Sequence, residues 1–199
     1  MNKVLALFVL VALVATITAA STAAPSTAAP VQPKPGGTLI YGLSVDPPDL
    51  EPHINSGASN GTVKMAVYEG LVKYWHGGRI TPALAERWGF VGQNQIVFHL
   101  RKDVKFHNGD PLTADDVKFS LERILDARTG ASLRWPFSLI QSVDVMDPLT
   151  VKVILRQPYS PFLAYLAQPY AAVVSRKFVQ GGANLRSTMM GTEIGRAHV

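Results

Sequence analysis

Four titratable residues lie close together in the chain and are its best candidates for reactive chemistry: His99, Asp103, His107 and Asp110. Side chains of these types serve as metal ligands or as general acids and bases. Their spacing favours neither role, because neither histidine has a partner ligand four residues away on one helix, as in H-E-x-x-H. His99 and His107 also fall on different predicted elements. We therefore expect no catalysis and no metal site at these residues.

The usual sequence marks of other chemistries are missing as well. Ser120 is not part of a G-x-S-x-G motif, so it is not expected to be a nucleophile. The sequence has no P-loop, so any energy coupling belongs to partner proteins. It also has no cysteine, which rules out disulfides, thiolate metal sites and a lipid-modified cysteine. We expect a protein that is not an enzyme and needs no cofactor.

The polar residues belong to a strand, a turn and a helix within residues 98–123. Apolar and polar side chains nearly alternate over residues 97–101, which predicts a half-buried strand. Residues 107–110 read His-Asn-Gly-Asp and predict a tight turn, because Asn and Gly tolerate a positive φ. Thr113 is expected to cap the helix by accepting a hydrogen bond from the N–H of Asp116. The apolar side of this helix is predicted to comprise Val117, Leu121 and Ile124.

This block resembles the signature of the family 5 extracytoplasmic solute-binding proteins, which are receptors of ABC importers. The pattern LRxDVxFxxGxPxTAxDVxxSxxR is matched from Leu100 to Arg123. Other motifs of the family follow in the expected order: D-P-x-x-L-x-P at 46–52, Y-E-G-L at 68–71, P-x-L-A-x-x-W at 82–88 and P-x-x-x-F-L-x-x-L at 158–166. The resemblance covers about residues 37–192.

The resemblance implies an α/β protein with the bilobal fold of the type II periplasmic binding proteins, of which this chain holds only the N-terminal lobe. It implies a receptor that closes on its ligand by a hinge and then docks on a permease in the inner membrane. The expected ligand is a small peptide, and a monomer is expected for the full-length protein. A nickel-chelate or oligosaccharide receptor is the alternative within the family. A secreted hydrolase and a purely structural envelope domain are the alternatives outside it.

Five residues are candidates for ligand contact. Asn55, Ser56 and Asn60 follow the 46–52 loop, which in the family leads to the ligand cleft. Trp135 and Tyr170 are aromatic residues outside any clear core stripe. A structural role is the alternative for each of the five. Aromatic rings stack on peptides, sugars and metal chelates alike, so they do not identify the ligand.

The N-terminal residues predict export. Residues 1–20 have the features of a cleavable signal peptide: Lys3, an uncharged apolar run over residues 4–17, and small residues over 18–20. An uncleaved membrane anchor is the alternative. Residues 21–36 are rich in Ala, Pro and Thr and are expected to form a disordered spacer. Together these features predict a periplasmic protein that is not a lipoprotein.

The remaining chain is expected to hold one modest core at residues 37–192, the N-terminal part of the solute-binding domain. Residues 193–199, EIGRAHV, are compatible by back-translation with a sequencing adapter and are interpreted as a non-native tail; a natural tail is the alternative. The formal net charge of +5 comes from scattered basic residues, and no run of them alternates with aromatic residues. Nucleic acid is therefore not an expected partner.

Hydrophobic periodicity predicts the other elements. Strands are expected at 38–43, 150–155 and 173–174, and hairpins at 74–80 and 90–100. Helices are expected at 63–71, at 82–88 with Trp88 in the core, at 159–167 and at 177–179.

Overall fold

The computed structural model describes residues 40–43, 46–54 and 58–193, with the backbone alone for residues 58–60. The chain divides into two units, residues 1–41 and 42–199. The predicted signal peptide, the spacer and the tail after Glu193 lie outside the described residues. In the part that is described, no helix is both long enough and apolar enough to cross a membrane.

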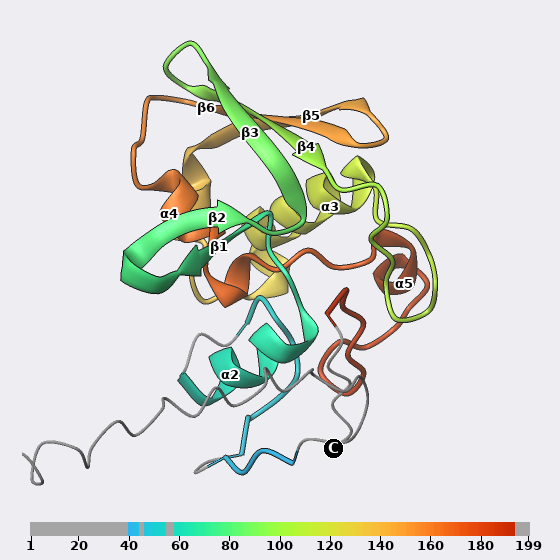
Figure 1. The fold of residues 1–199 in the computed structure, drawn as a ribbon. Coiled ribbons are helices and arrows are strands. Elements are labelled where there is room, and N and C mark those ends of the chain that lie inside the picture. Colours follow the sequence, from blue (N-terminus) through green and yellow to red (C-terminus); the bar gives the residue numbers. More distant parts are fainter. Residues whose placement is uncertain (1–39, 44–45, 55–57, 194–199) are drawn as a thin grey trace, which may run out of the picture. The chain divides into compact units, whose positions relative to one another are not determined.

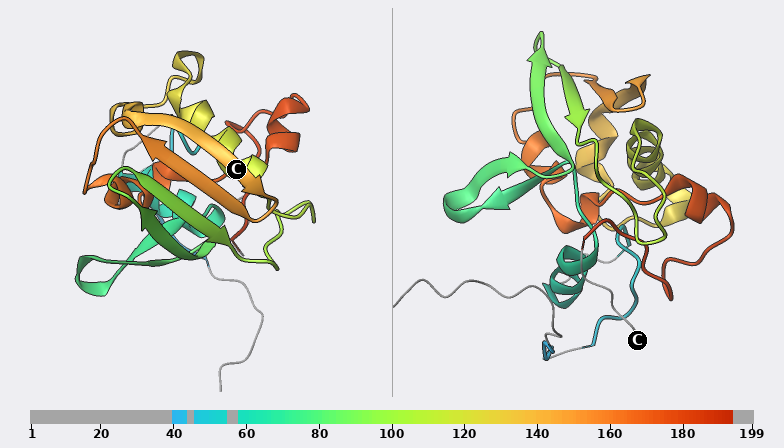
Figure 2. Two further views of the ribbon diagram at one scale, coloured as in Figure 1. Left: turned by 90° about the horizontal axis from the view of Figure 1, so that it is seen from above. Right: turned by 45° about the vertical axis from the view of Figure 1, so that its right-hand side comes forward.

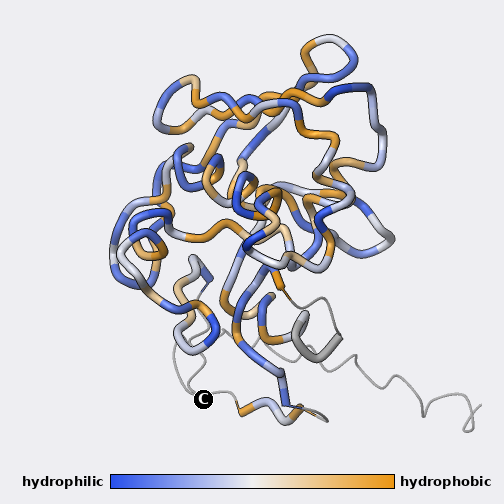
Figure 3. The backbone as a smooth tube through the Cα atoms, turned by 180° about the vertical axis from the view of Figure 1, so that it is seen from behind, coloured by the Kyte–Doolittle hydropathy of each residue, from blue (hydrophilic) through white to orange (hydrophobic). Residues whose placement is uncertain are grey.

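A four-stranded antiparallel sheet forms one side of the second unit and lies at the top of Figure 1, above the helices. Its strands are β3 (Ala85–Val91), β4 (Gln95–Leu100), β5 (Ile140–Asp147) and β6 (Thr150–Leu155). Their order in the sheet is β3-β4-β6-β5, so two hairpins meet where β4 pairs with β6. In β4 and β6 every second residue is buried, as the alternating sequence predicts. Figure 3 shows that hydrophobic and hydrophilic residues are interspersed along the backbone of this unit.

The predicted signature helix is α3 (Ala114–Leu125), which packs against β5 and β6. Its first turn is closed by a capping box between Thr113 and Asp116. The Asp116 carboxylate accepts hydrogen bonds from the Thr113 N–H (2.9 Å) and from the Thr113 hydroxyl (2.8 Å). The predicted apolar residues of the helix are all buried in the main core, where Val117 is 0% exposed.

A second sheet has two strands, β1 (Val72–Trp75) and β2 (Arg79–Pro82). The short helix η1 (His76–Gly78) joins them, which confirms the hairpin expected at 74–80. Both glycines of η1 have a positive φ, 75° at Gly77 and 77° at Gly78, which side chains with a Cβ rarely adopt.

Shorter helices complete the unit (Figure 2). They are α2 (Ala58–Val67), η2 (Ala127–Thr129), η3 (Trp135–Leu139), α4 (Phe162–Leu166), η4 (Pro169–Ala171) and α5 (Arg176–Gln180). The main core lies between the sheet, α3 and α4, and includes Phe98, Phe137 and Phe162. A smaller core joins α2 to the segments around residues 172–174 and 185–189, with Leu50 and Val67 among its members.

Three predicted elements are wrong. Residues 82–88 do not form a helix: they span the end of β2 and most of β3, and Trp88 pairs with Phe98 in the sheet. Leu84 and Ala85 are fully buried, and their backbone N–H groups donate to the carbonyls of Gly70 and Leu71. These tertiary hydrogen bonds override the local apolar spacing. Trp88 is half-buried and packs against the edge of the core.

The other two errors are strands. Of the strand expected at 38–43, residues 40–43 are described and form no strand, and Ile40 is 91% exposed; residues 38 and 39 lie outside the described residues. Val173 and Val174 are buried, but their N–H groups donate to the Glu69 carbonyl and to the Ser120 hydroxyl instead of to a neighbouring strand. Val173 belongs to the main core and Val174 to the smaller core. The two residues are therefore apolar because their segment passes from one core to the other, and not because it forms a strand.

Candidate functional site

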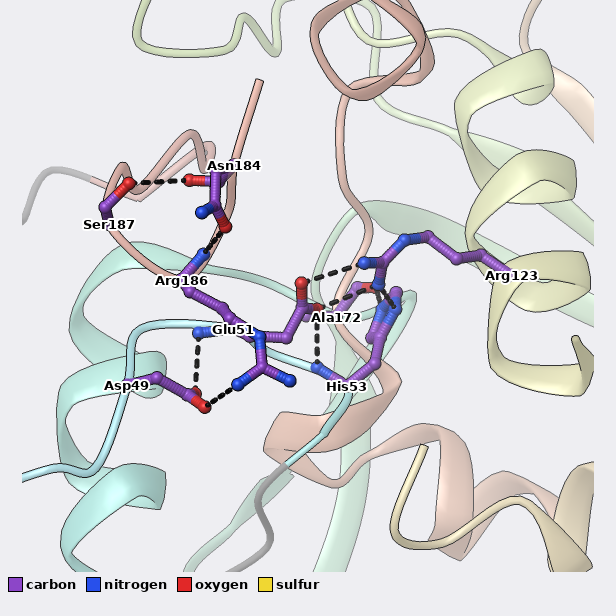
Figure 4. A network of polar contacts seen from close by, with 8 residues as sticks. All are labelled: Asp49, Glu51, His53, Arg123, Ala172, Asn184, Arg186 and Ser187. Atoms are coloured by element: carbon purple, nitrogen blue, oxygen red, sulfur yellow. Dashed lines mark hydrogen bonds and ion pairs between the residues drawn. The ribbon is translucent and has the colours of Figure 1, made fainter. Parts of the chain in front are cut away.

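The loop at residues 46–52, which was expected to lead to the ligand cleft, is fixed by a buried ion pair. Arg123, the last residue of the signature, donates from Nη1 to Glu51 Oε1 and from Nη2 to Glu51 Oε2, both at 2.8 Å (Figure 4). The side chains are only 16% and 3% exposed. Such a two-point contact fixes both distance and orientation. The loop is thereby held against the C-terminal half of α3.

His53 extends the Glu51–Arg123 ion pair to a network of three residues, which we name the buried anchor. Its Nδ1 lies 2.7 Å from Arg123 Nη1, and its Nε2 lies 2.9 Å from the Ala172 carbonyl oxygen. A guanidinium only donates, so Nδ1 accepts and Nε2 carries the hydrogen. Burial, together with the Arg123 charge, lowers the pKa of His53 from 6.5 to about 4. The imidazole is therefore neutral at pH 7 and links the loop to the segment that crosses between the cores.

Further hydrogen bonds stiffen the same loop. The Glu51 N–H donates to Asp49 Oδ1 (3.1 Å), and the His53 N–H donates to Glu51 Oε1 (3.2 Å). Arg186 donates from Nη1 to Asp49 Oδ2 (3.4 Å) and accepts a hydrogen bond from the Leu50 N–H through its carbonyl (Figure 4). The loop is thus tied to a second segment, near residue 186, that is distant in the sequence.

A buried lysine on α2 adds a charge beside this network. Lys64 is 2% exposed, and burial lowers the pKa of its ammonium group. The carboxylates of Asp49 and Glu51 act in the opposite direction and favour the charged form. The buried members of the network, Glu51, Arg123 and Lys64, therefore balance acidic and basic groups with little contact to solvent, and removing one of them leaves a buried charge without its partner.

Two polar residues of the signature hold the crossing segment. The Val174 N–H donates to Ser120 Oγ (2.9 Å), and the Ser120 hydroxyl donates to the Asp116 carbonyl (2.6 Å). Asp116 Oδ1 accepts from the Arg176 N–H (2.8 Å). These residues act on backbone groups and position the chain. They do not form a nucleophile and base.

The four residues first considered for catalysis are not brought together. His99 Nδ1 lies 3.3 Å from the Thr150 hydroxyl, whereas His107 lies against the backbone of Gly191 and Glu193. Asp110 binds Asn108 and Lys177. Within the described ranges, no group of three His, Cys, Asp or Glu side chains is arranged to hold a metal ion.

The five predicted contact residues are only partly described. Asn55 and Ser56 lie outside the described residues, and Asn60 lies in α2 without a described side chain. Trp135 begins η3 and is 58% exposed. Tyr170 lies in η4 and is half-buried, and burial raises the pKa of its hydroxyl to about 12.

Trp135 and Tyr170 belong to two separate sets of ring contacts. The Trp135 ring meets Tyr165 edge-on at 5.2 Å, and Tyr159 stacks on Tyr165 at 6.2 Å. The Tyr170 ring meets Phe137 edge-on at 6.3 Å, and Phe137 meets Phe162 edge-on at 6.2 Å. Sequence reasoning missed Tyr159 and Tyr165, although both tyrosines flank the recognised P-x-x-x-F-L-x-x-L motif.

Tyr159 borders a pocket of about 210 Å³. Its other lining residues come from β3, the β3–β4 turn, β4, the end of β6 and the segment around Tyr159: Phe90, Gln93, Asn94, Ile96, Leu155, Pro158 and Ser160. Pockets for small ligands usually exceed about 300 Å³. The pocket therefore does not by itself form a complete ligand site.

Comparisons with known proteins place this arrangement in a family. The model for bacterial extracellular solute-binding proteins of family 5 matches residues 79–193, more than half of the chain. The probable D,D-dipeptide-binding periplasmic protein DdpA of Escherichia coli K12 is 33% identical over 71% of this chain and 28% of its own length. The dipeptide-binding protein of the same organism is 33% identical over 71% of this chain and 30% of its own.

Solved structures agree with this fold. The binding protein AgaA from A. tumefaciens R10, in complex with agropinic acid, superposes with a TM-score of 0.71 at 36% identity, over 76% of this chain and 31% of that one. The murein tripeptide binding protein MppA of Escherichia coli superposes with a TM-score of 0.72 at 23% identity, over 79% and 35%. The described residues thus have the α/β fold of one part of these type II binding proteins, and the chain spans about a third or less of the relatives that it matches. The chain belongs to family 5 of the bacterial extracellular solute-binding proteins.

Proposed function

We propose that this chain is the solute-binding component of an ABC importer, which captures small peptides and delivers them to a permease in the inner membrane. The observation that carries this proposal is the 33% identity, over 71% of the chain, to two relatives whose names specify dipeptides. The polar side chains of the signature support a binding role, since they hold backbone segments and each other in place.

The buried anchor has a clear use in such a receptor. A cleft wall must keep its shape while the protein closes on a ligand, because each group that is ordered on binding lowers the affinity. The Glu51–Arg123–His53 network fixes the loop in advance. We propose that Asn55, Ser56 and Asn60, which follow this loop, face the ligand, and that Trp135 and Tyr170 offer aromatic surface to it.

The remaining expectations fit the same role. Residues 1–20 direct export through a cleavable signal peptide, so the mature protein lies in the periplasm without a lipid anchor. The relatives include proteins named as periplasmic. The protein has no catalytic activity of its own, and the full-length protein is a monomer.

A thermal-shift screen of the mature protein, expressed from its complete gene, tests the proposal. Di- to pentapeptides are expected to raise the melting temperature in a concentration-dependent way, because a ligand that binds only the folded state stabilises it. Trp135→Ala is expected to weaken this shift, whereas Trp75→Ala, a change at a similarly exposed tryptophan away from these ring contacts, is expected to preserve it. No response to any peptide would refute the peptide assignment.

A second candidate is a receptor for a small solute that is not a peptide. It is favoured by the 36% identity to AgaA, whose structure contains agropinic acid. A structure of NikZ from Campylobacter jejuni with Ni(L-His), 27% identical, represents the nickel-chelate alternative. Agropinic acid, Ni(L-His) and oligosaccharides therefore belong in the same screen. A shift with one of them and none with peptides would replace the proposed ligand.

A further inference from the structure

The hairpin of β1 and β2 has one face that is open to solvent. The register pairs Lys73 with Thr81 and Trp75 with Arg79. Directly paired residues of an antiparallel ladder lie on the same face, and so do alternate residues of one strand. Lys73, Trp75, Arg79 and Thr81 therefore share a face, which we name the Trp75 face.

The opposite face of the hairpin is the one that contacts the rest of the fold. It carries Val72, which is 1% exposed, and Tyr74, whose hydroxyl donates to the Ala164 carbonyl at 3.2 Å. On the Trp75 face, by contrast, Trp75 is 59% exposed and both Lys73 and Arg79 are exposed. Figure 2 shows the hairpin projecting beyond the other elements of its unit.

The charge of this hairpin has one sign. Residues 72–82 contain Lys73, His76 and Arg79 but no acidic residue. No ion pair among the described residues includes Lys73 or Arg79. Glu69 lies just before the hairpin; burial raises the pKa of its carboxyl group, and the charge of Lys73 acts in the opposite direction. The Trp75 ring lies edge-on to His76 at 5.3 Å. The exposed Trp75 indole therefore lies opposite one cation, Arg79, and two residues along the same strand from another, Lys73.

We propose that the Trp75 face binds the surface of a membrane that contains anionic lipid. The indole is an amphipathic ring that suits the headgroup region, and Lys and Arg beside it meet lipid phosphates. Both requirements are met on one exposed face of the two strands. At the tip, a Cβ added to Gly77 or Gly78 would meet no atom within 4 Å, so the tip itself is not crowded by neighbouring groups. This role is independent of the ligand cleft.

Another hairpin tip provides a contrast within the same chain. Phe90, in β3 beside the β3–β4 turn, is 61% exposed, about as much as Trp75. Residues 88–95 around it contain no charged residue. A hydrophobic contact alone would use either tip, whereas the proposed contact requires the tip that also has cations.

Vesicle flotation of the mature protein tests the proposal. Vesicles with phosphatidylcholine and phosphatidylglycerol at 3:1 are expected to retain the protein, pure phosphatidylcholine vesicles to retain little, and added salt to release it. The double variant Lys73→Gln/Arg79→Gln is expected to lower the partition coefficient about 25-fold, since each cation contributes about 1 kcal/mol near such a surface. Trp75→Ser is expected to lower it as well.

Two matched variants control for general effects of charge and exposure. Lys102→Gln/Lys105→Gln removes two exposed cations elsewhere, and Phe90→Ser removes the comparable aromatic ring. Both are expected to bind vesicles like the unaltered protein, and unchanged far-UV spectra show that all variants fold. Three outcomes would overturn the proposal. Control and test variants could lose vesicle binding equally, or both kinds of vesicle could retain the protein equally. The third outcome is binding to soluble polyphosphate without binding to vesicles.

Discussion

The Arg123 guanidinium meets the Glu51 carboxylate through two parallel hydrogen bonds of 2.8 Å, and it donates to His53 Nδ1 from the same nitrogen that binds Glu51 Oε1. Arg123 ends the signature motif, whereas Glu51 lies in the D-P-x-x-L-x-P motif. Two motifs that were recognised separately are therefore the two halves of one contact. The contact explains why an arginine, with its planar fork of donors, suits this position.

Removing one member of this pair is expected to destabilise the fold strongly. Arg123→Ala leaves the buried Glu51 carboxylate unpaired, which costs about 3 to 5 kcal/mol in typical buried pairs. Arg123→Lys is expected to recover only part of this loss, because an ammonium group does not reproduce the two-point contact. Urea unfolding measures both variants.

The matched control is Arg128→Ala. Arg128 also forms an ion pair, with Asp126 at 2.7 Å, but its side chain is 91% exposed. Solvent screens such a pair, so little change in the urea midpoint is expected. Similar changes in the urea midpoint for Arg123→Ala and Arg128→Ala would show that burial of the Glu51–Arg123 pair adds nothing to the stability of the fold.

His53 predicts a loss of stability in mild acid. Its pKa is about 4 in the folded protein and about 6.5 when the chain is unfolded, so between these values only the unfolded chain binds the proton. The free energy of unfolding is therefore expected to fall as the pH falls from about 6.5 to about 4, by about 3 kcal/mol in total from this residue. Denaturant midpoints measured across this range give the slope.

The control for this prediction is His53→Gln. A glutamine amide is able to take over hydrogen bonds from the ring but does not titrate. The variant is expected to have a flatter dependence of stability on pH between 4 and 6.5, whatever its stability at pH 7. An unchanged slope would assign the acid sensitivity to other groups.

Ser120 predicts a local effect on the crossing segment. Ser120→Ala removes the acceptor of the Val174 N–H, and leaving a buried N–H unpaired costs about 1 to 3 kcal/mol. The Val174 amide is expected to exchange its hydrogen faster in the variant. Ser138→Ala is the control, because the Ser138 hydroxyl donates to a carbonyl at an exposed position, and little change is expected there. Unaltered exchange at Val174 in Ser120→Ala would contradict this assignment.

Gly191 predicts a steric effect. A Cβ at this position would overlap the Val67 carbonyl oxygen, so Gly191→Ala forces one of the two backbone segments to move. A loss of about 1 to 3 kcal/mol is expected, as for other overpacked sites. Gly61→Ala is the contrast: its Cβ meets no atom within 4 Å, and alanine in the α2 helix is expected to stabilise by about 0.5 to 1 kcal/mol. Thermal unfolding compares the two, and equal stability of both variants would refute the close approach.

The sequence predicted the elements whose local pattern and tertiary environment agree. Three local features form as expected: the alternating burial along β4 and β6, the capping residues of α3, and the glycine turn between β1 and β2. Residues 82–88 were read as a helix because Leu84, Ala85 and Trp88 suit a helical face. Their backbone groups instead bind segments far away in the sequence, which no local pattern encodes.

The candidate site was predictable to a lesser degree. The motifs identified the family, but the sequence did not reveal that Glu51, His53 and Arg123 form one network, because such a contact depends on how separate elements pack. The sequence predicts Trp135 and Tyr170 as isolated aromatic residues, whereas in the fold the Trp135 ring contacts Tyr165 and the Tyr170 ring contacts Phe137. Ligand contact at these residues stays a prediction.

The pairing of β4 with β6 has a consequence for biogenesis. Gln95 pairs with Ile154, so the strand at the centre of the sheet obtains its second neighbour only after the whole signature segment has been synthesised. Until then, Ile96 and Phe98, both buried in the final fold, remain accessible on an unpaired edge. Long-range pairing of this kind closes slowly. For the export proposed above, this delay is favourable, because translocation requires an unfolded polypeptide.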